Sequence, residues 1–384
     1  MKSYNYIFAG AGLSSLMLVY KMILSGKYAH KTILLIDPDL KKTNDRTWCF
    51  WEKPGHDWGN VVSKKWKNAK FANHEFSKNM DLTPYEYNMI RGIDFYKLVF
   101  ELIDKQANIH FLQTRVVDFQ DHGNNVSIIC ESETFSCEQF FNSVYDKNLV
   151  ENQTKFPILQ QHFVGWFLRS AQAVFDESTA NFMDFSVAQK GNTRFMYVLP
   201  TSPTEALLEP TLFSHKLLQR AEYEAEIERY AQELGIKSFE IVEKEHGSIP
   251  MTCYPFWNQN TQNVLHIGTA GGWTKASTGF TFFHSDKKTS ELLTWLQSET
   301  DFRKLRHKNK FWFYDLIFLE VLDRHNELGS EVFSSLFKSR NHELVFKFLN
   351  HETSFIEDLQ VMLRCPLVPF IGGFFRVFKK MMFS

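Results

Sequence analysis

Two glycines and one aspartate near the N-terminus have the residue types and the spacing that bind a nucleotide. The sequence Gly10-Ala11-Gly12 follows a short apolar run at residues 6–9 and precedes an apolar pattern of helical period. A second apolar run, residues 33–36, ends at Asp37. This order of strand, glycine turn, helix, strand and acid predicts a dinucleotide-binding βαβ unit. Gly10 permits a sharp turn, Gly12 lets N–H groups approach a pyrophosphate, and Asp37 would accept a hydrogen bond from a ribose hydroxyl.

A second junction of strand and glycines occurs far along the chain. The apolar run at 264–267 leads into Gly268, Gly271 and Gly272, and the sequence Ser-Thr-Gly-Phe follows at 277–280. Backbone N–H groups at such a turn also suit an anionic group. We therefore predict that these three glycines hold the other end of the same nucleotide.

Glu209 is an acidic residue in apolar surroundings. It is flanked by Leu207, Leu208 and Pro210, between a predicted strand at 194–200 and a predicted helix at 214–234. A carboxyl turned into an apolar cleft loses hydration, which raises its pKa and allows it to donate a proton at neutral pH. The alternative is an acid that the dipole of the following helix favours.

Asp184 is the second candidate carboxylate. It lies between Met183 and Phe185 in a strand-like segment. It is either a partner of Glu209 in acid–base chemistry or a strand-end residue that bonds to backbone.

Composition narrows the functional classes. The 384 residues carry a net charge of −1 without blocks of like charge, so we predict no nucleic-acid partner. The five cysteines are scattered and lack a Cys-x-x-Cys pair, which indicates reduced thiols in a cytoplasmic protein and no metal site. No uncharged run approaches the roughly 20 residues that a membrane span needs. The 38 phenylalanines reflect either codon bias or a large apolar ligand.

The elements that position these residues follow from periodicity. A helix is predicted from Phe95 to about Lys105, then a third parallel strand near Phe111 and an antiparallel ribbon that ends at Cys130. The segments 64–82 and 164–199 are strand-like, and the chain beyond Phe311 is helical. The tail has an uncharged run, 365–375, with basic residues after it. It either lies in a bilayer interface or packs as a helix on the core.

These motifs, in the same order over nearly the whole chain, resemble the FAD-dependent lycopene cyclase family of the bacterial type. The specific parts are the Trp-Cys-Phe-Trp sequence at 48–51 and the glutamate that follows a Tyr-Val-Leu-Pro strand, Glu209. The matching stretches are residues 10–12, 45–51, 183–185, 195–200, 208–211, 249–251 and 271–280.

The resemblance implies an α/β fold with two lobes, of the flavoprotein hydroxylase/reductase-like type. Residues 1–60, 85–150 and 255–300 would form a discontinuous Rossmann-like FAD-binding domain, and residues 61–84 and 151–254 a mixed-sheet substrate domain. Residues 301–384 would form a helical C-terminal region that contacts the membrane.

The resemblance also implies a reaction: proton-initiated cyclisation of the ψ-ends of lycopene to β-ionone rings, redox-neutral overall, with reduced FAD. NAD(P)H would serve as the reductant of the flavin. Glu209 would be the proton donor or cation stabiliser, and Asp184 the second catalytic carboxylate. The expected cofactor-binding residues are Gly10, Ala11, Gly12, Leu13, Ser14, Asp37, Arg46, Arg91, Val117, Gly268, Gly271 and Gly272.

Some of these expectations have open alternatives. Arg46 either contacts the flavin or pairs with Asp45, and Arg91 is either a phosphate ligand or a surface arginine. The partners would be lycopene, related acyclic or monocyclic carotenoids and membrane lipid, with the protein cytoplasmic and peripherally bound to the membrane. The rival function is an FAD- and NAD(P)H-dependent monooxygenase of the aromatic-hydroxylase type. A third reading is a flavin-bound carrier of apolar lipids without catalysis.

Overall fold

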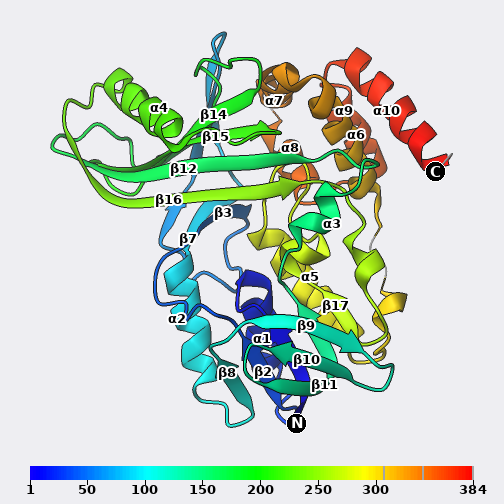
Figure 1. Ribbon diagram of the computed structural model, residues 1–384. Helices are drawn as coiled ribbons and strands as arrows, with labels where there is room; N and C mark the ends of the chain where they lie inside the picture. Colours follow the sequence, from blue (N-terminus) through cyan, green and yellow to red (C-terminus); the bar gives the residue numbers. More distant parts are fainter. Residues whose placement is uncertain (306–307, 340, 383–384) are drawn as a thin grey trace.

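The computed structural model describes residues 1–305, 308–339 and 341–382, in two lobes that lie one above the other (Figure 1). The predicted C-terminal region therefore includes residues 306–307, 340 and 383–384, which lie outside the described part of the chain. The lower lobe in Figure 1 contains the N-terminus, and the upper lobe carries the C-terminal helix.

A seven-stranded sheet forms the lower lobe, in the order β8-β2-β1-β11-β10-β9, with β17 paired to β11. Strands β8, β2, β1, β11 and β17 run parallel, whereas β10 pairs antiparallel with β11 and β9. The strands are β1 (Lys2–Ala9), β2 (Ile33–Ile36), β8 (Ile109–Leu112), β9 (Val116–Asp121), β10 (Val126–Cys130), β11 (Thr134–Asn142) and β17 (Val264–His266). The predicted βαβ unit, third parallel strand and antiparallel ribbon are confirmed.

Three helices share one apolar core with this sheet: α1 (Leu13–Ser25), α2 (Gly92–Ile103) and α5 (Phe282–Trp295). Helix α1 begins directly after the carboxyl end of β1, and α5 begins after the glycine junction that follows β17. Both glycine junctions consequently lie at the same edge of the sheet, where parallel strands end.

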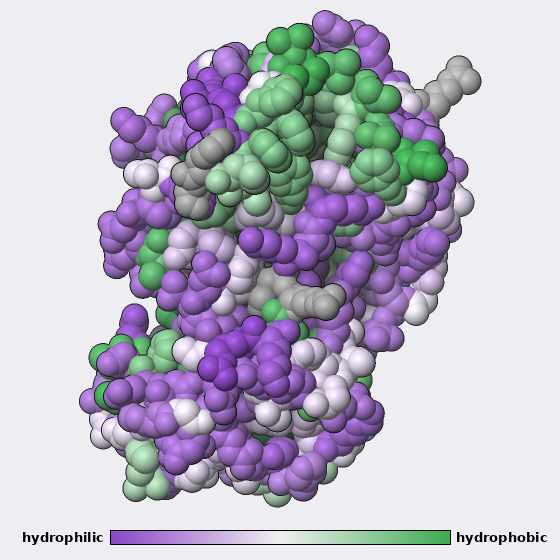
Figure 2. All heavy atoms as spheres, turned by 90° about the vertical axis from the view of Figure 1, so that its right-hand side faces the viewer, coloured by the Kyte–Doolittle hydropathy of each residue, from purple (hydrophilic) through white to green (hydrophobic). Residues whose placement is uncertain are grey.

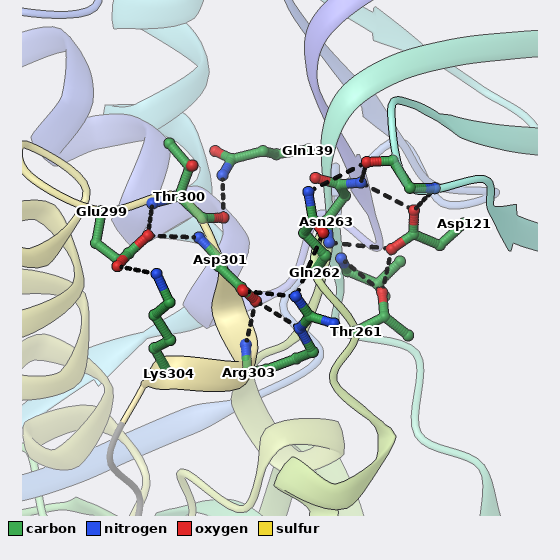
Figure 3. A network of polar contacts seen from close by, with 12 residues as sticks. Asp121, Gln139, Thr261, Gln262, Asn263, Glu299, Thr300, Asp301, Arg303 and Lys304 are labelled. Atoms are coloured by element: carbon green, nitrogen blue, oxygen red, sulfur yellow. Dashed lines mark hydrogen bonds and ion pairs between the residues drawn. The ribbon is translucent and has the colours of Figure 1, made fainter.

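A polar network fixes the chain that enters β17 (Figure 3). The Asp121 carboxylate, at the end of β9, accepts hydrogen bonds from the backbone N–H of Asn263 at 3.0 Å and from its amide at 2.9 Å. The side chain of Gln139 donates to the carbonyl of Thr300 at 3.0 Å. Sheet and loops are thereby joined, which sets the position of the second glycine junction.

A second seven-stranded sheet forms the upper lobe, in the order β16-β12-β15-β14-β13-β5-β6. Neighbouring strands are antiparallel, except that β13 and β5 are parallel. The strands are β5 (Asn68–Ala72), β6 (Ser77–Asp81), β12 (Leu159–Ser170), β13 (Thr179–Asp184), β14 (Thr193–Pro200), β15 (Glu205–Ser214) and β16 (Phe239–Met251). A three-stranded sheet of β3 (Thr47–Glu52), β7 (Glu86–Arg91) and β4 (Lys64–Trp66) lies between the two large sheets.

The upper sheet is covered on both faces. Helix α4 (Arg220–Glu233) packs on one face, and the C-terminal helices pack with the other in one large core. The other helices are α3 (Lys147–Glu151), α6 (Lys310–Arg324), α7 (Gly329–Lys338), α8 (His342–Leu349), α9 (Phe355–Met362) and α10 (Leu367–Met382). Short 3₁₀ turns lie at 256–259, 268–271, 302–304 and 326–328.

Two features of this lobe differ from the sequence prediction. The segment expected to begin a helix at Ser214 is still strand β15, because β15 pairs with β12 on one side and with β14 on the other. Glu209 therefore lies inside a strand and not before a helix. Strand β16 was not predicted, since three consecutive charged residues, Glu243, Lys244 and Glu245, interrupt its apolar pattern.

Asp184 ends β13 and connects this strand to helix α4. Its Oδ2 accepts a hydrogen bond from the hydroxyl of Tyr230 at 2.6 Å, and its Oδ1 accepts one from the backbone N–H of Ser186 at 2.9 Å. The side chain of Asn181 donates to Oδ2 as well, at 3.3 Å. These buried contacts give Asp184 the character of a strand-end residue that bonds to its surroundings.

Asp184→Asn is therefore expected to act on stability. The amide places an N–H₂ group against one of these donors, and the free energy of unfolding should fall by about 1–3 kcal/mol. Urea unfolding measures this change. Tyr230→Phe removes one donor and leaves the others, so its loss should be smaller. An unchanged urea midpoint for Asp184→Asn would contradict the structural role.

Candidate active site

A cavity of about 470 Å³ lies between the two lobes. One end is bounded by the glycine junctions of the lower lobe, at Gly12 and Gly268, and the other end by Glu209 and Glu245 of the upper sheet. Strand β3 contributes Thr47, Trp48 and Cys49 to its side wall. A ligand in this cavity would contact both lobes at once.

The first glycine turn requires glycine at one position. Gly10 has φ +87°, and a Cβ there would lie 2.3 Å from Oγ of Ser143. The N–H of Gly10 donates to the carbonyl of Ile36 at 2.8 Å. Gly12 is the N-cap residue of α1 and provides no side-chain hydrogen bond to the first turn. Gly12, Leu13 and Ser14 all line the cavity, so the N–H groups of this turn are available to an anion.

The side chain of Asp37 binds the backbone of this turn. Its Oδ2 accepts a hydrogen bond from the N–H of Ala11 at 2.7 Å, and the Nζ of Lys41 lies 3.5 Å from the same oxygen. Neither Asp37 nor Ala11 borders the cavity directly. The structure thus gives Asp37 a role in shaping the glycine turn.

The second junction contacts the first. Gly268 has φ +61°, and a Cβ there would lie 2.9 Å from Oγ of Ser14. Gly271 and Gly272 lie behind it, beside a separate cavity of about 100 Å³. Gly268 is therefore the one of the three glycines that reaches the main cavity.

The remaining predicted cofactor residues are dispersed. Arg46 borders the cavity, and its guanidinium donates to the carbonyl of Asp45 at 2.6 Å. Arg91 forms an ion pair with Glu243 outside the cavity lining. Val117 lies on β9 with 63% of its surface exposed, also outside the lining. For Arg91 and Val117, a cofactor contact remains a prediction that this cavity does not support.

Glu209 faces the cavity from the middle of the upper sheet. Along β15, Leu208 and Leu212 pack under helix α4, whereas Leu207 and Glu209 face the opposite side. This is the alternation of a strand between two layers. Glu209 is buried, and its Oε1 accepts a hydrogen bond from the hydroxyl of Thr211 at 3.1 Å.

A second glutamate, Glu245 of β16, lies beside Glu209. Gly165 of β12 runs between them and pairs in register with Glu245. A Cβ at Gly165 would lie 3.0 Å from Oε2 of Glu209 and 3.1 Å from Cγ of Glu245. Because Gly165 has no side chain, the two carboxyl groups meet across β12 and form a hydrogen bond. The Oε2 of Glu245 also accepts a hydrogen bond from the hydroxyl of Thr47 at 2.6 Å.

Burial and this neighbour set the protonation of Glu209. Desolvation raises the pKa of Glu209 well above its usual value, and the negative charge of Glu245 raises it further. Desolvation also raises the pKa of Glu245, but hydrogen bonds from Thr47 and Glu209 oppose that shift. Of the two carboxyl groups, Glu209 is therefore the one whose neutral form is favoured more strongly.

Aromatic residues form part of the cavity wall. Tyr87, Tyr197, Phe280 and Trp48 all border it. Tyr197 pairs in register with Glu209 across β14 and β15. Burial raises the pKa of both tyrosines well above the ordinary value, so their rings stay neutral. Neutral aromatic faces attract a cation.

In the structure the acidic neighbour of Glu209 is Glu245, whereas Asp184 lies elsewhere. Asp184 is absent from the cavity lining, and its oxygens accept hydrogen bonds from Ser186 and Tyr230. The period-2 pattern of Phe239–Met251, with acids at inward positions 243 and 245, is the sequence signal that could have identified Glu245.

Comparisons with known proteins identify a family and a fold for this chain. The model of the family described as "Lycopene cyclase protein" matches residues 5–372. No curated protein matches the sequence significantly.

Solved structures share the fold at low identity. A geranylgeranyl bacteriochlorophyll reductase-like protein from Thermoplasma acidophilum has a TM-score of 0.63 and 10% identity, over 98% of this chain and 100% of that chain. A flavoprotein/dehydrogenase from Cytophaga hutchinsonii has a TM-score of 0.62 and 10% identity, over 94% of this chain and 99% of that chain. For p-nitrophenol 4-monooxygenase PnpA from Pseudomonas putida the TM-score is 0.57 and the identity 11%, over 94% and 98%.

These similarities confirm the predicted fold class, an α/β flavoprotein-type fold with a mixed-sheet second lobe and a helical C-terminal region. The family match covers far more than half of the sequence. The chain belongs to the lycopene cyclase family.

Proposed function

We propose that this protein is a lycopene β-cyclase, which converts the open ψ-ends of lycopene to β-ionone rings without net redox change. The observation that carries the proposal is Glu209, a buried carboxyl group that borders the cavity between the lobes and whose pKa is raised by desolvation. Proton transfer to a carbon–carbon double bond requires such an acid, positioned at the reacting carbon.

The residues of the cavity fit FAD as the cofactor. Gly12, Leu13, Ser14 and Gly268 would hold the pyrophosphate through backbone N–H groups at the N-terminus of α1. Two buried side-chain oxygens in the cavity wall, Oε1 of Gln161 and Oγ1 of Thr278, have no hydrogen-bond partner among the described residues. A polar ring system in the cavity would provide donors for both. Reduced FAD would supply a negative charge that stabilises a cation.

The acid–base steps then need one proton and one carboxyl group. Glu209 donates its proton to the terminal double bond of the ψ-end, so its O–H bond breaks and a C–H bond forms. The next double bond attacks the resulting cation and closes the ring. The Glu209 carboxylate then takes a proton from the ring carbon, which restores the acid and leaves a product of unchanged mass.

The upper lobe would present the protein to lycopene in a bilayer. Helices α9 and α10 expose an apolar surface, visible as a hydrophobic area at the top of Figure 2. The surface consists of Phe355, Ile356, Leu359, Leu363, Leu367, Val368, Ile371, Phe374, Phe375, Phe378, Met381 and Met382. No helix in the described ranges is long and apolar enough to cross a membrane. An interfacial position with these side chains among the acyl chains is the arrangement we propose.

The inner side of α10 is held to the protein by charge. The buried carboxylate of Glu320 accepts hydrogen bonds from Arg376 at 3.0 Å and from Lys380 at 2.8 Å. Arg376 and Lys380, two of the basic residues that follow the uncharged run, thus face α6. Their contacts leave the apolar side of α10 facing outward.

The function is tested by incubating the protein with FAD and lycopene in membranes under reducing conditions, followed by mass analysis. We expect cyclised products of the same mass as lycopene, with NAD(P)H needed only to reduce the flavin. The monooxygenase alternative predicts stoichiometric NAD(P)H consumption and a product that has gained one oxygen atom, and that result would replace the proposal.

Glu209→Gln tests the acid. The amide keeps the size of the side chain and has no transferable proton, so cyclisation should fall at least about 100-fold while FAD binding and folding persist. Turnover per bound FAD is the measurement. Turnover of the Gln variant close to that of the wild type would remove Glu209 from the mechanism.

The apolar surface is tested by sedimentation with vesicles of phosphatidylcholine and phosphatidylglycerol. Val368 and Phe375 are 83% and 64% exposed, so the double variant Val368→Glu/Phe375→Glu should fold normally and sediment less. Leu24→Glu/Leu234→Glu, with two exposed leucines far from this surface, is the matched control. Equal sedimentation of both variants with the wild type would exclude this membrane contact.

A further inference from the structure

We propose that Glu245 is the charged partner of Glu209, so that the two carboxyl groups share one proton and Glu245 keeps Glu209 in its acid form. This inference rests on the proposed function for its catalytic meaning. Its structural basis is independent: the row formed by Tyr197, Glu209, Gly165 and Glu245 across the upper sheet.

The register of the sheet brings the two acids together. Strand β12 lies between β15 and β16, and any side chain at its central position would separate Glu209 from Glu245. Gly165 has no side chain and leaves that position open. A methyl group there would lie 2.8 Å from Cδ1 of Leu207, so the position does not accommodate even alanine without a shift. The pair is thus a consequence of one glycine in the middle of a long strand.

The surroundings of the pair assign the negative charge to Glu245. Thr47 donates to Glu245 at 2.6 Å, whereas Thr211 donates to Glu209 at the longer distance of 3.1 Å. The positive charge of Arg46 also favours the ionised form of Glu245, although Glu243 on the same strand opposes it. On the Glu209 side the facing groups from β3, β7 and β14 are Cys49, Tyr87 and Tyr197. Burial raises the pKa of each of these three groups, so they stay neutral.

The charge on Glu245 has two effects on the proposed reaction. Before proton transfer it keeps the proton on Glu209. After transfer, two carboxylates lie side by side, and their repulsion makes Glu209 a stronger base for the proton that the ring must lose. The proton that leaves Glu209 for one carbon returns to it from another, so no co-reactant is consumed.

The test is the pH dependence of cyclisation by Glu245→Gln. Activity requires neutral Glu209 and is lost as the pH rises through its pKa. Removing the neighbouring charge lowers that pKa. The alkaline limb of the pH–activity profile should therefore move to lower pH by roughly one to three units. Turnover at low pH should return to near the wild-type value. Glu240→Gln, an exposed glutamate on the same strand, is the control and should not move the limb.

Gly165→Ala provides a second variant. It keeps both acids and separates them, so its alkaline limb should also shift to lower pH. If Glu245→Gln loses activity equally at every pH, or if the limb stays in place in both variants, the proposed partnership is wrong.

Infrared spectroscopy of the purified protein supplies a readout that needs no lycopene. The carbonyl band of a protonated carboxyl should be present near neutral pH in the wild type and missing in Glu209→Gln. In Glu245→Gln it should disappear at lower pH than in the wild type. A shifted band together with no cyclisation by the wild-type protein would refute the proposed function and leave the partnership intact. An unshifted band would refute the partnership itself.

Discussion

The burial of one carboxyl group, that of Glu209, at the cavity between the lobes is the constraint on which the site depends. Burial alone would leave the polar atoms of Glu209 without partners, which costs free energy. The sheet resolves this by placing Thr211 on the same strand and Glu245 two strands away, with Gly165 between them. The acid is therefore desolvated and hydrogen-bonded at once. Its position is fixed by strand register, which a rigid sheet sets more tightly than a loop would.

The two lobes divide the chemistry between them. The lower lobe places two glycine junctions at the carboxyl edge of its parallel strands, where an anionic group meets backbone N–H groups. The upper lobe provides a wide antiparallel surface with the acids facing inward. Strand β3 lies between the lobes and joins the two functions, because Thr47 contacts Glu245 and Cys49 borders the same cavity. The first half of the Trp-Cys-Phe-Trp sequence, Trp48 and Cys49, therefore belongs to the cavity wall, whereas Phe50 and Trp51 are buried in the cores of the two lobes.

The sequence predicted the lower lobe well because its signals are local. The turn at Gly10, the helix after Gly12 and the strand ending at Asp37 lie within about 30 residues of one another, and a positive φ at Gly10 leaves few other residues possible. The acid pair could not be found in this way. Glu209 and Glu245 meet only through the register of three strands, and that register is set by pairings spread over residues 159–251. Asp184, like Glu209, is an acid between apolar neighbours in a strand-like segment. It lies at the end of its strand, however, where its carboxylate accepts a hydrogen bond from Tyr230. Periodicity alone does not distinguish these two environments.

In the proposed reaction, the geometry of the acid pair would compensate for the raised pKa of Glu209. A higher pKa makes an acid a weaker proton donor, whereas protonation of a double bond requires a strong one. Burial by itself would therefore raise the fraction of protonated Glu209 and lower the rate at which it gives up its proton. A neighbouring carboxylate changes this balance, because it attracts the developing cation while the proton moves. The aromatic faces of Tyr87 and Tyr197 act in the same direction without adding a base that could trap the proton. In the proposed mechanism, the pair and the two tyrosine rings would stabilise the charge that forms on the substrate more than the charge present before the reaction, which is the condition for catalysis.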